Sequence, residues 1–96
     1  MAKNITKSVT VGTSAVNVAT ALGLAANVAC TEMVLQNHDT NSGDIYFGES
    51  SVSTINGLKL VADYTERAAG NEPIQLGDIF IIATAAAQRV NIHVRV

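Results

Sequence analysis

Cysteine and cationic residues are both scarce in this chain, and each shortage excludes some classes of protein. Cys30 is the only cysteine, so no disulfide forms within the chain, and a reducing compartment is the simpler assumption. Six Lys and Arg residues face eight Asp and Glu residues, which gives a formal net charge of -2. The chain therefore lacks the excess of positive charge that is typical of nucleic-acid-binding domains, and we expect no nucleic-acid partner.

Aromatic residues are also few: the sequence has no Trp, two Tyr and two Phe. A carbohydrate-binding module usually exposes aromatic rings that stack on sugars. Tyr46, Phe47, Tyr64 and Phe80 are the whole supply, and we expect at least two of them to be buried. A carbohydrate-binding module is therefore a weak alternative on sequence grounds.

Charge is missing altogether from residues 8–31, yet this segment does not predict a membrane span. Its longest apolar run covers only residues 21–26, whereas a spanning helix needs roughly 20 apolar residues. Residues 1–7 likewise lack the apolar stretch of a secretory signal. We expect no membrane partner, and we interpret part of the uncharged segment as a surface that another chain covers.

The apolar residues that are present follow the period of β-strands. Val90, Ile92, Val94 and Val96 alternate with polar residues, which predicts a half-buried strand over residues 88–96. Residues 78–84 contain an unbroken apolar run, residues 79–83, that is typical of a central strand covered on both faces. Residues 85–87 are then expected to form the turn between these two strands.

Other segments predict further short strands, and no segment predicts a convincing helix. Asn56-Gly57 is a strong tight-turn signal, so we expect the segments on either side of it to pair as a hairpin. At 96 residues the chain is long enough for one domain. We predict an all-β fold, a single small β-sandwich or jelly-roll-like domain with about seven or eight short antiparallel strands. Residues 1–8 form an N-terminal arm and the start of the first strand, and residues 9–96 form the sandwich. The further strands are expected at residues 5–11, 16–19, 28–37, 51–55, 58–65 and 74–76.

One short stretch, HDTNSGD at residues 38–44, has the composition of a metal site. An EF-hand loop needs oxygen ligands at positions one, three and five, a glycine at six and a glutamate at twelve. Counted from Asp39, only the first two ligands match, and Gly43 and Asp44 occupy the wrong positions. Asn, Asp, Ser and Gly also favour bent backbone, so we interpret the stretch as a loop between two strands.

No other motif predicts chemistry. His38 and His93 are the only histidines, and no Cys/His spacing supplies the four ligands of a zinc site. Cys30 lies among small apolar residues, where cysteines are commonly inert. The glycines form no phosphate-binding pattern, and no serine lies in a nucleophile-elbow pattern. We therefore predict a protein that is not an enzyme, with no catalytic, cofactor-binding or metal-binding residues.

The order of several short motifs resembles a group of small structural proteins of tailed bacteriophages. The similarity extends over roughly residues 5–96. The motifs that carry it are Val9-Thr-Val11, Leu35-Gln-Asn37, Ile45-Tyr-Phe-Gly48, the turn Val52-Ser-Thr-Ile-Asn-Gly57 and the last strand Val90-Asn-Ile-His-Val94.

This resemblance implies a capsid decoration, or cement, protein. Such a protein binds the outer surface of the shell of major capsid protein, bridges neighbouring capsomers and stabilises the DNA-filled head. It is typically a homotrimer or homodimer, made in the bacterial host cytoplasm and carried on the virion. The first alternative is a base component of a phage tail or head fibre. We predict an interface that combines the N-terminal arm, the uncharged segment and the polar face of the last strand: Lys3, Ile5, Lys7, Val16, Val18, Leu22, Leu24, Arg89, His93 and Arg95.

Overall fold

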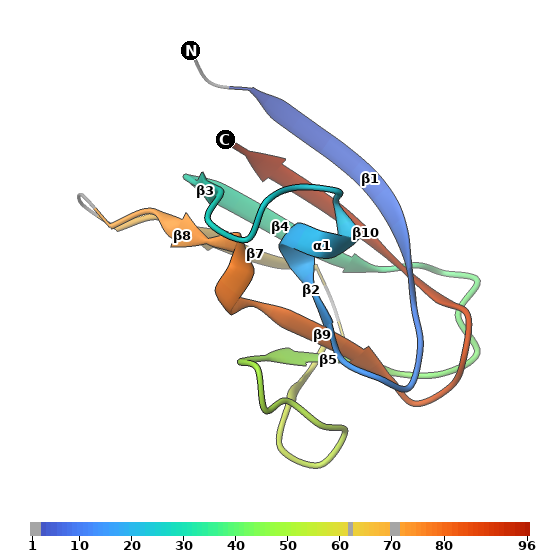
Figure 1. Cartoon of the computed structure of the whole chain (residues 1–96). Coiled ribbons are helices and arrows are strands. Elements are labelled where there is room, and N and C mark those ends of the chain that lie inside the picture. The colour runs from blue at the N-terminus through green and yellow to red at the C-terminus, as the bar shows by residue number, and fades with distance from the viewer. Residues whose placement is uncertain (1–2, 62, 70–71) are drawn as a thin grey trace.

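Two antiparallel four-stranded sheets make up most of the protein, as the computed structural model shows for residues 3–61, 63–69 and 72–96 (Figure 1). The first sheet has the order β1 (Asn4–Val11), β10 (Gln88–Arg95), β4 (Glu32–Asn37) and β7 (Tyr64–Arg67). The second has the order β2 (Val16–Asn17), β9 (Phe80–Ala83), β5 (Ile45–Gly48) and β6 (Leu58–Lys59). A third pair consists of β3 (Ala29–Cys30) and β8 (Ile74–Gln75). The helical elements are α1 (Val18–Ala21) and the short 3-10 helix η1 (Leu76–Asp78).

The connections between the eight strands of the two larger sheets follow the pattern of a jelly roll. The first strand, β1, pairs with the last, β10, and β2 pairs with β9, the one before it. Next to these pairs lie β4 and β5, and β7 and β6 form the far edges of the two sheets. This is the two-sheet arrangement of jelly-roll domains. The prediction of a small all-β jelly-roll-like sandwich is confirmed.

The core lies between the sheets and follows the period-two pattern of the sequence. In β10, Val90, Ile92 and Val94 are fully buried, while Arg89 and Arg95 are exposed. The predicted strand at residues 88–96 is therefore confirmed. Burying each such aliphatic side chain contributes roughly 1.5–3 kcal/mol, so the alternation fixes which face of the strand points inward. The apolar core residues of the other strands include Val9, Val11, Met33, Leu35, Ile45, Phe47, Ile81 and Ala83.

The central strand is shorter than its apolar run predicts. β9 begins at Phe80 because η1 occupies residues 76–78, and Ile81, Ile82 and Ala83 are buried on both faces of the sheet. The predicted turn at residues 85–87 is confirmed, and it places Ala87 in the left-handed region, with φ 59°.

The predicted hairpin around Asn56-Gly57 is wrong. Residues 51–55 form no strand, and residues 49–57 form the loop between β5 and β6. The Ser53 N–H donates to Asn56 Oδ1 at 2.7 Å, and the Gly57 N–H donates to the Ser53 carbonyl at 2.9 Å. These local bonds compete with strand pairing and fold the segment on itself. The strand predicted at 58–65 is divided between β6 and β7, and Ala62 lies outside the described residues.

Two further expectations change near the N-terminus. The strand predicted at 16–19 ends at Asn17, whose side-chain Oδ1 accepts from the N–H groups of Ala19 (2.8 Å) and Thr20 (3.3 Å) and so caps α1. The predicted arm is mostly strand, since β1 begins at Asn4, and residues 1–2 lie outside the described residues. The strand predicted at 28–37 divides into β3 and β4, with Met33 and Leu35 buried as expected.

Candidate binding edge along β1 and β10

The HDTNSGD stretch is a connection between the two sheets, and its polar groups bind the protein itself. It joins β4 to β5. The Asn41 side chain donates through Nδ2 to the Arg89 carbonyl at 2.7 Å and accepts through Oδ1 from the Arg89 N–H at 2.7 Å. Its Oδ1 thus takes the place of a main-chain acceptor for the Arg89 N–H at the end of β10. The Gly43 N–H donates to Oε1 of the buried Gln88 at 2.8 Å, which ties the loop to the core.

The histidine and acid of the same loop contact their own neighbours. His38 Nδ1 accepts from the Thr40 N–H at 3.2 Å and lies 3.3 Å from an Asp39 carboxylate oxygen. Within the described residues, no three His, Cys, Asp or Glu side chains gather as metal ligands would. The interpretation of residues 38–44 as a loop between strands is confirmed, although the strands belong to different sheets.

Cys30 is a buried thiol of β3. Burial raises its pKa, and the nearby Glu66 acts in the same direction, so the reactive thiolate is disfavoured. Among the described residues, no helix is both long enough and apolar enough to cross a membrane.

Six of the predicted interface residues lie on or beside the adjacent strands β1 and β10, although they do not share one face of the sheet and Ile5 is half-buried against the core. Lys3, Ile5 and Lys7 belong to β1 or directly precede it, and β1 pairs antiparallel with β10. The other three, Arg89, His93 and Arg95, occupy alternate positions of β10 and point to the outer face of the first sheet. Sequence motifs from the two ends of the chain therefore form one continuous edge region.

The remaining four predicted interface residues do not join this edge. Val18 and Leu22 are 0% and 6% exposed and belong to the core, so their assignment to a docking surface is wrong. Val16 and Leu24 are half-buried and pack against the same core. The uncharged segment is thus explained in part by its folding inward through β2 and α1.

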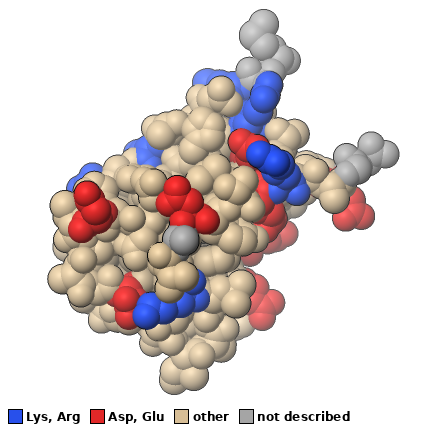
Figure 2. All heavy atoms as spheres, turned by 180° about the vertical axis from the view of Figure 1, so that it is seen from behind, with Lys and Arg blue, Asp and Glu red and all other residues tan. Residues whose placement is uncertain are grey.

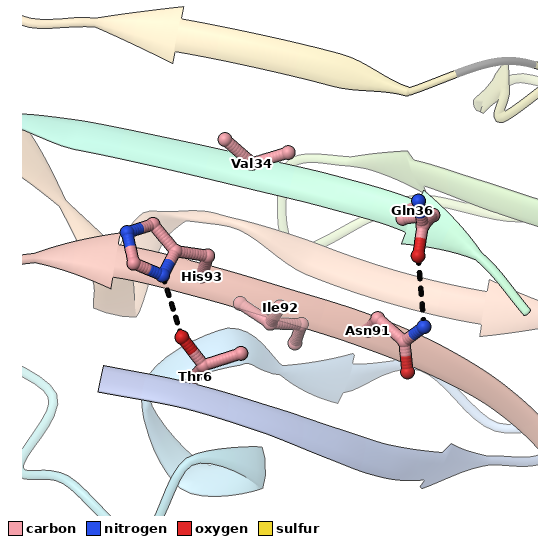
Figure 3. A pocket seen from close by; sticks show the side chains of 6 residues that line it. All are labelled: Thr6, Val34, Gln36, Asn91, Ile92 and His93. Atoms are coloured by element: carbon pink, nitrogen blue, oxygen red, sulfur yellow. Dashed lines mark hydrogen bonds between the residues drawn. The ribbon is translucent and has the colours of Figure 1, made fainter. Parts of the chain in front are cut away.

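Side chains on the outer face of the first sheet bind one another across the strands (Figure 3). His93 Nδ1 lies 2.6 Å from the Thr6 hydroxyl, and Asn91 Nδ2 donates to Gln36 Oε1 at 2.9 Å. These four residues, together with Val34 and Ile92, line a hollow of about 200 Å³. The hollow borders β1, so it forms part of the same edge region.

Positive charge is concentrated on β1 and β10. Residues 3–11 and 88–96 contain four of the six cations of the chain and none of its eight acids. The four cations are Lys3, Lys7, Arg89 and Arg95, all exposed, and none takes part in an ion pair within the described residues. Figure 2 shows most of the blue side chains in the upper half of the face, where the N-terminus lies.

The acid opposite Arg95 in the first sheet is already paired. Glu32 on β4 is opposite Arg95, but its carboxylate accepts from Arg67 Nε at 2.9 Å. This bond is the main reason why the pKa of Glu32 is below its usual range, with smaller effects from His93 and Arg95. The positive charge of the β1–β10 edge is therefore only partly balanced by its own sheet.

The main chain of β1 offers unpaired hydrogen-bonding groups along the same edge. Lys3 and Val96 exchange both main-chain hydrogen bonds, at 2.7 and 2.8 Å, and such pairs recur at every second residue of an antiparallel ladder. The residues between them direct their N–H and C=O groups away from β10, where they have no main-chain partner within the described residues. These residues are Asn4, Thr6, Ser8 and Thr10.

A second exposed surface was missed by the sequence analysis. Ile55, Leu58 and Val61 are 95%, 65% and 78% exposed, and they lie on or beside β6 and the loop that precedes it. The expected hairpin placed these residues in strands, so their exposure was not predicted. β6 is an edge strand of the second sheet, on the side away from β2, whereas β1 is an edge strand of the first sheet.

No family model, no curated protein and no solved structure matches this chain.

Proposed function

We propose that the chain is a capsid decoration protein of a tailed bacteriophage, which binds the outer surface of the major capsid protein shell and bridges neighbouring capsomers. In this proposal it is made in the bacterial host cytoplasm, acts as a homodimer or homotrimer, and resides on the outside of the virion. The sequence resemblance suggests this role. The jelly roll is compatible with it, because viral capsid proteins are among the proteins that use this architecture.

The observation that carries the proposal is that one small sandwich exposes two separate surfaces with groups available for binding. A bridging protein must hold two partners at once. The β1–β10 edge offers cations and open main-chain groups, and the triplet Ile55, Leu58 and Val61 offers exposed apolar side chains. Exposed apolar clusters on small proteins commonly mark interaction sites. Weak contacts at both surfaces reinforce one another when one molecule engages two capsomers.

Cosedimentation with phage heads tests this function. Purified chain is mixed with DNA-filled heads that lack it, and the bound fraction and the temperature of DNA release are measured. We expect saturable binding and a higher release temperature. The double variant L58D/V61D should lose most of both effects, whereas Thr13→Asp, an exposed change on another part of the surface, should retain them. A wild-type chain that neither cosediments nor raises the release temperature would contradict the proposal.

Carbohydrate binding is the second candidate, because one hollow carries suitable groups. Phe80, Glu49 and Asp78 line a depression of about 490 Å³ beside η1 and β9. An aromatic ring with nearby carboxylates can stack on a sugar and accept hydrogen bonds from its hydroxyl groups. A glycan array distinguishes the candidates: binding that Phe80→Ala abolishes would favour this function, and an array without signal would leave decoration as the better account.

A further inference from the structure

The open side of β1 is the longest free strand edge in the two main sheets. β1 has eight residues, whereas the other edge strands β2, β6 and β7 have two, two and four. An exposed edge strand of this length is a template for pairing with another chain. Proteins usually protect such an edge, and β1 has only one charged residue, Lys7, within its bounds.

We propose that β1 accepts an extended acidic peptide segment of a partner as an additional antiparallel or parallel strand of the first sheet. This is β-strand addition, in which main-chain bonds supply affinity and side chains supply specificity. This inference deepens the proposed function. It rests on the proposed function only for the identity of the partner, which would then be a shell protein. The strand acceptor itself is argued from this chain alone.

Hydrogen bonding determines that the occupant is extended peptide. The open N–H and C=O groups of β1 alternate along the edge and match the donors and acceptors of a neighbouring strand. A nucleic acid offers phosphate acceptors but no donors spaced along a β-strand. The side chains beside these open groups are Asn, Thr or Ser, which are small and polar, so they leave the edge accessible.

Charge complementarity determines that the occupant is acidic. Lys7 lies within β1, Lys3 directly precedes it, and Arg89 reaches across β1, where its Nε donates to the Ser8 hydroxyl at 3.1 Å. Lys7 pairs with the buried Ile92 and so lies on the inner-face side of the sheet, whereas Arg89 lies on the outer face. Alternating acidic side chains of an added strand share one face, and either face of this edge offers them positive charge. A second copy of the chain is a poorer match, because β1 contains no acidic residue that could pair with these cations.

The proline variants Ser8→Pro and Thr65→Pro, each of which removes one main-chain N–H, make a matched test. The Ser8 N–H points to the open edge, so proline removes one donor there without breaking the ladder with β10. Ser8→Ala controls for the lost contact with Arg89. Thr65 is on β7, the opposite edge of the same sheet. The Thr65 N–H also faces outward. The main-chain bond between His38 and Arg89 fixes which residues of β4 bond to β10, and the alternate residues of β4 therefore bond to Tyr64 and Glu66 of β7. Thr65, which lies between these two, directs its N–H away from β4.

The probe is a capped ten-residue peptide of alternating Glu and Val, compared with a Lys and Val peptide and with a single-stranded oligothymidine. Binding is followed by fluorescence anisotropy, and amide exchange is followed by NMR. We expect the acidic peptide to bind at least tenfold more tightly than the basic one, and high salt to weaken it. Ser8→Pro should weaken binding by about tenfold, as the loss of main-chain bonds predicts, whereas Ser8→Ala and Thr65→Pro should not. The Thr6, Ser8 and Thr10 amides should exchange more slowly in the complex.

Three results would overturn the inference. The first is acidic-peptide binding that Ser8→Pro does not change, and the second is oligothymidine binding that is tighter than peptide binding. The third is a homodimer of the chain alone in which the Thr6, Ser8 and Thr10 amides are already protected. If the chain binds phage heads and Ser8→Pro binds equally well, the inference fails and decoration stands. If the peptide binds as expected but the chain does not bind heads, decoration fails and the strand acceptor stands.

Discussion

Gln88 is the one buried polar residue among those that the structure describes, and replacing it tests how the sheet-to-sheet loop is held. Its Oε1 accepts from the Gly43 N–H at 2.8 Å, and its Nε2 donates to the Ala86 carbonyl at 2.9 Å. Gln88→Met keeps the length of the side chain but removes both bonds. The Gly43 N–H then loses its partner in a partly buried site, while the Ala86 carbonyl is near solvent.

The expected cost follows from these two bonds. One net hydrogen bond contributes about 1 kcal/mol, and an unsatisfied buried donor costs about 1–3 kcal/mol. We therefore expect Gln88→Met to lower the free energy of unfolding by about 2–3 kcal/mol. That is a large part of the roughly 5–14 kcal/mol available to a domain of this size, and it corresponds to a fall in Tm of roughly 10–20 °C.

Urea unfolding followed by circular dichroism measures this change, with the m-value as a check that the two-state analysis holds. Gln75→Met is the matched control, because Gln75 is exposed on β8, and its effect should stay within about 0.5 kcal/mol. NMR exchange of the Gly43 amide gives a local readout that should accelerate. A loss below 0.5 kcal/mol with an unchanged Gly43 amide would refute this account of the loop.

Three further predictions concern single positions. Ala87→Gly should raise stability by about 0.5–1 kcal/mol, measured by thermal unfolding, because Ala87 has φ 59° and the left-handed region costs an L-residue roughly 1–2 kcal/mol, of which the backbone entropy of glycine offsets roughly 0.5–1 kcal/mol; a lower Tm would contradict it. Gly77→Ala should destabilise the fold by at least about 1 kcal/mol in urea, since the new Cβ would lie 2.2 Å from the Ala26 carbonyl oxygen; an unchanged midpoint would show that this contact relaxes freely. Because the pKa of Glu32 is lower in the folded protein than in the unfolded chain, its ionised carboxylate should stabilise the fold at pH values above the usual glutamate pKa, and this stabilisation should be lost as the pH falls through the pKa of the folded state. Arg67→Gln should raise the pKa of Glu32 in an NMR titration. An unchanged titration would show that the ion pair is not the cause of the lowered pKa.

The sequence predicted strands well where one face alone is apolar. β10 alternates without exception, and each of its inward aliphatic residues is buried. Prediction failed where side chains bind their own backbone. Asn17 caps a helix within a segment that resembles a strand, and Asn56 folds residues 51–57 into a loop. Such local bonds depend on geometry that residue type alone does not determine.

The candidate site was predicted in part, for a similar reason. Ile5, Arg89 and His93 were chosen from two separate segments, and only the pairing of the first strand with the last brings them together. Val18 was chosen because its segment has no charge, but the absence of charge does not distinguish a covered surface from a core. The exposed position of Ile55 follows from the loop and had no signal in the hydrophobic pattern.

Quantitative mass spectrometry of purified virus particles from the source culture tests the central claim most directly, because it counts copies of the chain per particle. A decoration protein is predicted at hundreds of copies per particle, in fixed proportion to the major capsid protein. Between three and a few dozen copies would instead assign the chain to a neck, tail or fibre. Its absence from the particles would contradict the proposed function.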